Sequence, residues 1–276
     1  MRLLVTTDFS ENSKGAVRFA QTLAKQSKSV EVTFYHAIRI MKPTQWSDVF
    51  FKEYKDAEIA RLTEDLKKFI YSTLGRGKGK FAKMKFIIDH SSSTEKDIIT
   101  FAEKHKINFI CIATKGAGML RKVMGTHTSY IVKNSTIPLL VIPSHYIQKP
   151  LEKATYLSDF ENLKKEVVKI SKFSNEISMQ LEVLHYASAI IDTKKFEKNK
   201  ELFKTELFAN IELKIQKNNY ERSLIEKVTN HVQKTKPELL ILFTKREKGF
   251  FERLFLPSKS VELTYTTKVP ILIYSK

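Results

Sequence analysis

Cysteine is almost absent from the sequence, and long apolar runs are missing. The 276 residues include one cysteine, Cys111, so an internal disulfide is excluded and the composition is typical of a cytoplasmic protein. Cys111 lies in the apolar segment INFICIA, where we expect a thiol buried in a strand. No run of about eighteen apolar residues predicts a membrane span. The apolar run before Asp8 is too short for a signal peptide, so we expect a cytoplasmic protein.

Residue patterns typical of metal sites and enzymes are also missing. The histidines show no metal-ligand spacing, and a single cysteine adds no ligand set. The serine run at 91–93 lacks the pattern of a nucleophile elbow. Asp8 could assist hydrolysis of a bound phosphate through a metal, but no second carboxylate with a clear role accompanies it. The sequence therefore predicts no catalytic residue and no metal site, and it argues against an enzyme.

Acidic residues are too few to balance the basic ones. The chain has 48 lysine and arginine residues against 30 aspartate and glutamate residues, a formal net charge of +18. A field of that sign attracts anions, including nucleic acids and phosphate compounds. The basic residues are nevertheless spread out, as in KGKFAKMK (78–85) and KKFEKNKELFK (194–204). We interpret them as a solvated basic surface and do not expect a nucleic-acid site, although a basic nucleic-acid-binding module remains an alternative.

The sequence contains an internal repeat. The segment LLVTTDFSENSKGAVRFAQTLAK, from Leu3, is similar to ATYLSDFENLKKEVVKISKFSNE, from Ala154, and each places Asp-Phe after a short apolar run. Later segments match in the same order: VEVTFYHA with LEVLHYA, INFICIATKG with PELLILFTKR, and STIPLLVIP with TKVPILIYS. The match of VEVTFYHA with LEVLHYA makes His36 equivalent to His185, and we expect a shared structural role. Such ordered matches indicate a tandem duplication. We predict two domains, residues 1–146 and 152–276, with a linker near 145–153.

Strand and helix patterns alternate within the repeat unit. We expect strands at residues 2–5, 30–36, 83–89, 109–113 and 139–142, because these runs are almost continuously apolar. Ser10 and Ser93 are suited to cap helices that follow them. A longer helix has apolar residues at three- and four-residue steps between Trp46 and Leu74. The order predicts an α/β protein of two tandem, doubly wound parallel sheets, Rossmann-like, with five strands each.

Two loops of the first repeat are candidates for a ligand site. In doubly wound sheets, ligands bind outside the carboxyl ends of the strands, where the strand order reverses. One such loop spans residues 6–10, after the first strand, and the other spans 114–126, after the fourth. Gly125 allows the backbone to approach a phosphate closely. The amides of Thr126, His127 and Thr128, at the start of a helix, can face an anion.

The stretch after the fourth strand resembles the ATP-binding fingerprint of universal stress proteins. That fingerprint is a glycine, two residues, a glycine, nine residues, and a glycine followed by serine or threonine. Gly116, Gly125 and Thr126 match it, and TTDFSENS, with Asp8, is similar to the loop that follows the family's first strand. The resemblance covers essentially the whole chain and implies an adenine nucleotide alpha hydrolase-like fold. The site residues that it implies are Thr6, Thr7, Asp8, Ala37, Ala113, Lys115, Gly116, Gly125, Thr126, His127 and Thr128.

The fingerprint departs from the family pattern in both repeats. In the first, Ala113 replaces the first glycine, and only eight residues separate the two remaining glycines. In the second, Phe243 stands at a glycine position, and a proline–serine pair at 257–258 replaces the glycine–hydroxyl pair. Proline has no N–H to donate, and a phenylalanine would fill space that ribose needs. We therefore expect any nucleotide in the first domain and a structural role for the second.

The resemblance also implies a function and partners. It implies a non-enzymatic stress-response or signalling protein that binds ATP or a related adenine nucleotide, with Mg²⁺ only when ATP is bound. The adenine would contact the positions of Asp8 and Ala37. The last strands of the two domains, residues 139–142 and 271–274, would pair as an intramolecular pseudo-dimer. Two alternatives are left open by the sequence: that the chain forms a homo-oligomer, and that it is a weak ATPase or adenylyl-transfer enzyme of the same fold.

Overall fold

The structure, a computed structural model, divides into two compact units. One unit comprises Met1–Ala117 and Met124–Gln148, and the other contains Lys149–Lys276. The residues that the structure describes are 1–75, 81–91, 93–114, 126–187, 197, 199, 201–209, 211–217, 221–244 and 269–275. The predicted pairing of the last strands of the two units stays a prediction.

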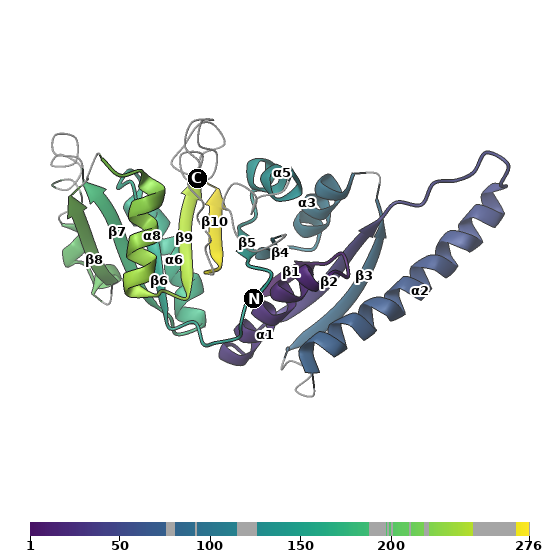
Figure 1. Ribbon diagram of the computed structural model, residues 1–276, viewed down its shortest axis with the longest axis horizontal. Coiled ribbons are helices and arrows are strands. Elements are labelled where there is room, and N and C mark those ends of the chain that lie inside the picture. Colours follow the sequence, from purple (N-terminus) through teal and green to yellow (C-terminus); the bar gives the residue numbers. More distant parts are fainter. Residues whose placement is uncertain are drawn as a thin grey trace. The chain divides into compact units, whose positions relative to one another are not determined.

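The first unit is a parallel sheet of five strands (Figure 1). Its strands are β1 (Arg2–Thr6), β2 (Glu31–Ile38), β3 (Lys83–His90), β4 (Phe109–Ala113) and β5 (Leu139–Ile142). They lie in the order β3-β2-β1-β4-β5, and every pair is parallel. The predicted doubly wound topology is confirmed, because the chain moves outward from β1 to β3 and then returns to β4 on the other side of β1.

Helices cover both faces of this sheet. They are α1 (Lys14–Gln26), α2 (Asp48–Leu74), α3 (Thr94–Lys104) and α5 (Thr126–Asn134), and the short 3-10 helix η1 (Glu11–Ser13) precedes α1. α1 contacts α2 and α3 contacts α5, so each pair forms one layer. This arrangement explains why the strands are apolar on both faces: β1 and β4 include Leu3, Leu4, Ile110 and Cys111, all fully buried. Burial raises the pKa of the Cys111 thiol, as expected for a thiol packed in a strand.

Three details of the first unit differ from the sequence predictions. Ser10 does accept a hydrogen bond from the Ser13 amide, but the helix that it caps is η1 rather than α1. Ser93 occupies the N-cap position of α3 without a capping bond from its side chain. α2 begins after Ser47, which accepts a bond from the Phe50 amide, so Trp46 lies outside the helix. The ends of α2 were predicted within two residues, and the capping contacts were predicted less well.

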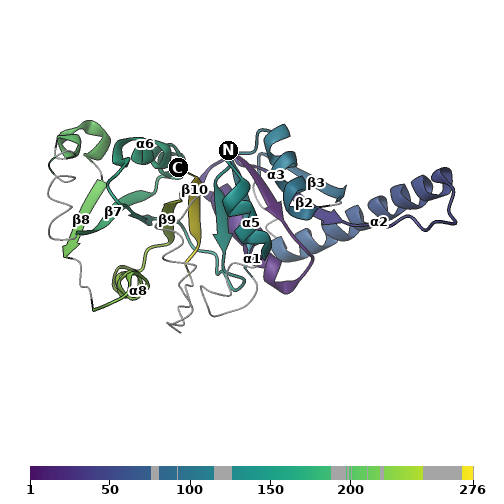
Figure 2. The same ribbon diagram turned by 90° about the horizontal axis from the view of Figure 1, so that it is seen from above.

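The second unit repeats the topology of the first. Its elements are β6 (Lys153–Leu157), α6 (Leu163–Glu176), β7 (Gln180–Ala187), η3 (Leu202–Lys204), η4 (Glu206–Phe208), β8 (Ile211–Lys217), α8 (Leu224–Thr235), β9 (Leu239–Thr244) and β10 (Ile271–Ser275). The order β10-β9-β6-β7-β8 is the same as in the first unit, and all pairs are parallel. Figure 2 shows α6 and α8 on opposite sides of the strands. The tandem duplication read from the sequence is therefore present in the fold.

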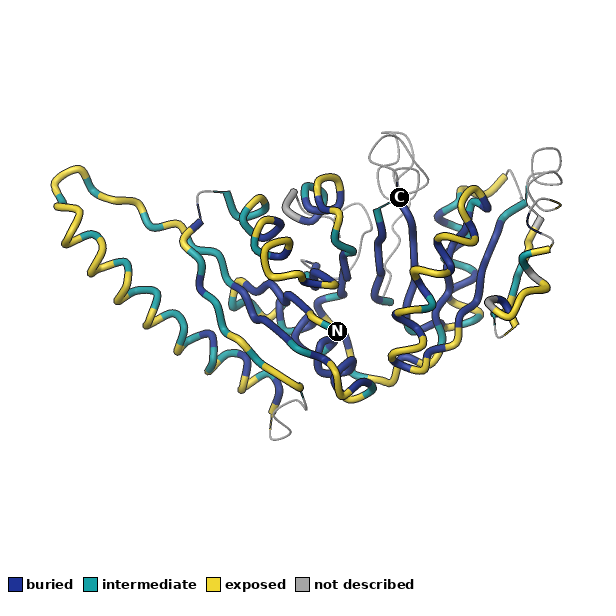
Figure 3. Tube along the Cα trace, turned by 180° about the vertical axis from the view of Figure 1, so that it is seen from behind, coloured by how far each residue is buried: buried dark blue, intermediate teal, exposed yellow. Residues whose placement is uncertain are grey.

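Burial is concentrated in the central strands and the helix faces that cover them (Figure 3). A close approach within the first unit depends on Gly15, near the start of α1. A Cβ on Gly15 would overlap the Pro143 carbonyl oxygen, directly after β5, and would lie 2.9 Å from the Ser144 carbonyl oxygen. Glycine is therefore required where α1 crosses the end of β5.

Candidate functional site

The candidate site lies at the carboxyl ends of β1 and β4. These two strands are neighbours, and the chain leaves them in opposite directions, so they form the point where the strand order reverses. The loop after β1 and the segment between β4 and α5 both begin there. This is the position at which open α/β sheets bind ligands.

The loop after β1 is held in one conformation by Thr7. The Thr7 amide donates to the Tyr35 carbonyl at 3.0 Å. Its hydroxyl lies 2.7 Å from the Ser13 hydroxyl and accepts a bond from the Phe9 amide at 3.1 Å. Phe9 has φ 61, in the left-handed region that non-glycine residues rarely adopt. Strained backbone of this kind clusters at ligand sites, which makes the loop a candidate site.

Asp8 is the exposed residue of this loop. Its Oδ1 accepts hydrogen bonds from the Ser10 amide at 3.1 Å and from the Ser10 hydroxyl at 2.5 Å. These bonds fix the carboxylate beside the end of β1 while leaving it open to solvent. A ligand outside the strand ends can therefore reach it.

His36 supports the same loop from β2. Its Nδ1 lies 2.7 Å from the Thr7 carbonyl oxygen, so this nitrogen carries the proton and donates it. The ring centroid lies 4.6 Å from that of Phe9, in an edge-to-face contact. Ala37, the next candidate, is half-buried near the end of β2. His36 thus positions the loop, and Ala37 is the next residue of β2.

The second unit repeats this arrangement. Phe160 has φ 60, and its amide donates to the Ser158 hydroxyl at 3.1 Å. His185 Nδ1 lies 2.8 Å from the Ser158 carbonyl oxygen, and its ring stacks on Phe160 at 4.0 Å. The shared structural role predicted for His36 and His185 is confirmed. The left-handed phenylalanine was missed, although Asp-Phe occurs at the same place in both repeats.

Three threonines among the candidates are buried and do not face solvent: Thr6, Thr7 and Thr128. Thr6 is 9% exposed, and its hydroxyl donates to the Cys111 carbonyl across β1 and β4 at 3.5 Å. Thr128, in the first turn of α5, is 4% exposed. The Thr6 hydroxyl thus links β1 to β4. The sequence did not reveal which way these side chains point, and their part in a ligand site stays a prediction.

On the β4 side of the site, the structure describes the end of β4 and the start of α5. β4 ends at Ala113, which is half-buried, and the Thr114 amide donates to the Ile142 carbonyl at 2.8 Å. α5 begins at Thr126, so its first amides are at the predicted place. The other candidates of this segment lie outside the described residues: Lys115, Gly116, Gly125, and the side chains of Thr126 and His127.

In the second unit, the position equivalent to Ala113 is occupied by a large side chain. Phe243, which stands where Ala113 does, is 4% exposed. Its ring stacks on Tyr274 at 4.8 Å and meets Tyr156 at 5.6 Å. Phe243 therefore belongs to the core of this unit. The proline–serine pair at 257–258 lies outside the described residues.

A buried ionic cluster lies in the second unit, centred on Glu182 of β7. This carboxylate is fully buried and accepts bonds from His231 Nε2 at 2.6 Å, Lys214 Nζ at 2.6 Å and Thr155 Oγ1 at 2.9 Å. Burial opposes ionisation of Glu182, but the bonds from His231, Lys214 and Thr155 together outweigh it and lower its pKa to about 2. The cluster joins three strands to α8 and was not foreseen from the sequence.

The described part of the chain lacks two further kinds of feature. It contains no group of three histidine, cysteine, aspartate or glutamate residues arranged to hold a metal ion. Within the same residues, no helix is long and apolar enough to cross a membrane.

Comparisons with known proteins agree with the fold. A universal stress protein from Archaeoglobus fulgidus DSM 4304 has a TM-score of 0.67 at 14% identity, covering 99% of this chain and 98% of that chain. A putative universal stress protein from Pseudomonas aeruginosa UCBPP-PA14 has a TM-score of 0.60 at 12% identity, covering 99% and 92%. No protein of curated function matches the sequence. The model of the Universal stress protein family matches residues 1–143, more than half of the chain. The chain belongs to the universal stress protein family.

Proposed function

We propose that this chain is a non-enzymatic stress-response protein whose first unit binds ATP or a related adenine nucleotide. The observation that carries the proposal is the loop after β1, which stands in the unit where the fourth strand ends at the small Ala113 and not at a buried phenylalanine. It lies at the point where the strand order reverses, is held in a left-handed turn at Phe9, and exposes Asp8. A rigid loop at this place is suited to recognise a ligand, because little conformational entropy is lost on binding.

The binding mode follows from the family resemblance. Asp8 and Ala37 would contact the adenine, and the segment that joins β4 to α5 would hold ribose and phosphates. The first amides of α5 would donate to a phosphate, helped by the helix dipole. The Thr7 hydroxyl is engaged within the loop and the Thr6 hydroxyl between strands, so these residues would act through the backbone. Mg²⁺ would enter only with bound ATP.

The second unit serves a structural role in this proposal. Phe243 packs in the core where the first unit has Ala113, and its backbone is part of β9. The side chain therefore removes space beside the strand end that a ribose would require. We also propose that the protein acts in the cytoplasm, consistent with its single, buried cysteine.

Calorimetric titration with ATP and with AMP tests the proposal. We expect the intact chain to bind one nucleotide. Gly125→Val should abolish binding by denying the backbone its approach to phosphate, whereas the matched change Pro257→Val in the second repeat should leave the affinity unchanged. Loss of affinity in both variants, or no binding by the intact chain, would contradict the proposal.

Two controls separate the alternatives. Purified protein incubated with ATP and Mg²⁺ should release no phosphate or pyrophosphate. A weak ATPase or adenylyl-transfer enzyme would instead show a measurable rate, and Asp8→Ala would abolish that rate. Binding to DNA and RNA should be measured at low salt, because a nucleic-acid module would show affinity that falls steeply as salt rises.

A further inference from the structure

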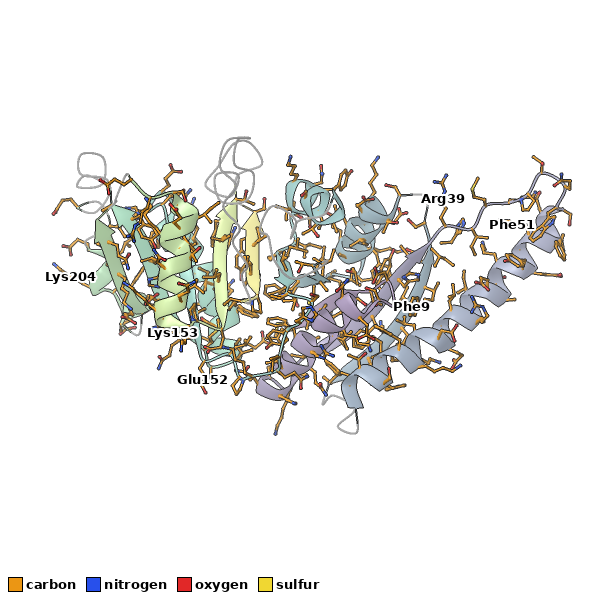
Figure 4. The ribbon with its side chains drawn as sticks, viewed as in Figure 1. Phe9, Arg39, Phe51, Glu152, Lys153 and Lys204 are labelled. Carbon is orange, nitrogen blue, oxygen red and sulfur yellow. The ribbon has the colours of Figure 1, made fainter. Side chains whose placement is uncertain are left out.

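The first half of α2 projects from the first unit. Figure 1 shows this part of the helix and the segment before it extending beyond the edge strand β3, and Figure 4 shows Arg39 and Phe51 on them. We call residues 39–62 the arm. The buried residues of α2 are Leu66, Ile70 and Leu74, all in its last third. The arm part of the helix therefore has no buried residue, although the sequence pattern predicted one apolar face along its whole length.

The arm exposes large apolar side chains. Met41 is 74% exposed, Val49 68%, Phe50 51% and Tyr54 44%, and these four are half of the exposed large hydrophobic residues in the described part of the chain. Trp46 joins two of them into an aromatic cluster, since its ring meets Phe50 at 4.7 Å and Tyr54 at 5.0 Å. Exposed apolar groups that gather in one place indicate an interaction surface.

A helix of this length gains little stability alone. Isolated helices of about 12–15 residues are marginal in water, and most helix stability in proteins comes from packing of an apolar face. The ion pairs that Arg61 makes with Glu58 and Asp65 are exposed, and such pairs contribute little. A second surface against the arm would provide the missing packing.

The charges of the arm suit a second copy of this chain. The arm contains five basic and four acidic residues, so its net charge is +1, whereas the whole chain carries +18. The basic residues are Arg39, Lys42, Lys52, Lys55 and Arg61, and the acidic ones are Asp48, Glu53, Asp56 and Glu58. Two copies that meet at their arms therefore bring little net charge together. The mixed signs do not suit an anionic membrane or a nucleic acid, which select basic faces.

The face of the arm that points away from the sheet is complementary to itself. Glu53, Ala57, Ala60 and Arg61 lie on this face at three- and four-residue steps, next to the aromatic cluster. Its ends carry opposite charges, and its middle carries two alanines, which let helices approach closely. Glu53 forms no ion pair with any described residue.

We propose that two copies of the chain associate through antiparallel arms. The two Ala57 residues lie at the symmetry axis, Tyr54 of each copy packs on Ala60 of the other, and Glu53 of each pairs with Arg61 of the other. Such an isologous contact is closed by a two-fold axis. The contact is small, so the association is reversible and depends on concentration.

Sedimentation equilibrium of the full chain tests the proposal with two charge reversals. Glu53→Arg and Arg61→Glu each place like charges opposite one another, so each variant alone should stay monomeric. An equimolar mixture restores both pairs and should associate as the intact chain does. Concentrations from about 1 to about 300 µM are needed, since small interfaces have micromolar or weaker dissociation constants.

Two measurements complete the design. Ile147→Glu, at a site 82% exposed and outside the arm, is the matched control and should associate normally. Trp46 is the one tryptophan of the chain, so its emission reports on the arm and should shift to shorter wavelength with association. Circular dichroism spectra should match that of the intact chain if each variant is folded. An intact chain that is monomeric throughout, single variants that associate normally, or a mixture that fails to recover would each overturn the proposal.

Discussion

At the scale of single residues, the unexpected feature is the repeated turn after the first strand of each unit. Phe9 and Phe160 both adopt left-handed backbone, and each packs against a histidine whose Nδ1 donates to a carbonyl of the same turn. Each turn costs of order 1–3 kcal/mol of strain, so its presence in both units indicates a requirement of the fold. The turn alone therefore does not identify a nucleotide site, and the loss of space at Phe243 distinguishes the units.

Glu182 gives a prediction at this scale. The carboxylate titrates with a pKa of about 2 in the folded chain, against an ordinary value near 4.5. A carboxyl group with a lowered pKa stabilises the fold above its unfolded pKa, and this stability is lost as pH falls from about 4.5 to about 2. The change is of order 3 kcal/mol for such a shift.

Urea unfolding of the intact chain and of Glu182→Gln between pH 7 and pH 2 measures this contribution. The variant leaves His231 and Lys214 without their carboxylate, so it should lose roughly 3–5 kcal/mol at pH 7. The difference between the two proteins should shrink as pH falls through that window. A difference that is the same at every pH would show that the ionised carboxylate does not stabilise the fold.

At the scale of elements, the packing of α1 gives a second prediction. Gly15→Ala introduces a methyl group that overlaps the Pro143 carbonyl. Alanine favours a helix by up to about 1 kcal/mol over glycine, but overpacking costs about 1–3 kcal/mol, so we expect a net loss of stability. The control Lys25→Ala, at the exposed end of the same helix, should stay within about 0.5 kcal/mol of the intact chain in urea unfolding.

A Gly15→Ala variant as stable as the intact chain would mean that α1 can move away from the end of β5. The higher helix propensity of alanine would then outweigh the cost of overpacking, and glycine would not be required at residue 15.

The strands could be predicted from the sequence because a parallel sheet covered on both faces leaves continuous apolar runs. α2 was predicted less well, since Val49 and Phe50 follow the same helical steps as Leu66 and Ile70 but lie beyond the sheet. The spacing of apolar residues indicates which of them share a helix face. It does not indicate where the sheet that covers this face ends. For the same reason the candidate site was located by topology, while the directions of Thr6 and Thr128 were not foreseen.

At the scale of the whole molecule, the chain is a duplication whose copies have diverged. Both units keep the strand order and the histidine-supported turn, as packing requires. They differ at the end of the fourth strand, with Ala113 in one and the buried Phe243 in the other. The proposed function is therefore asymmetric, with nucleotide confined to the first unit.

Amide hydrogen exchange with and without ATP tests this asymmetry most directly. We expect slower exchange on binding at residues 8–10 and in the first turn of α5, and unchanged exchange at the equivalent residues 159–161. Equal slowing in both repeats, slowing in the second alone, or no change in either would contradict it.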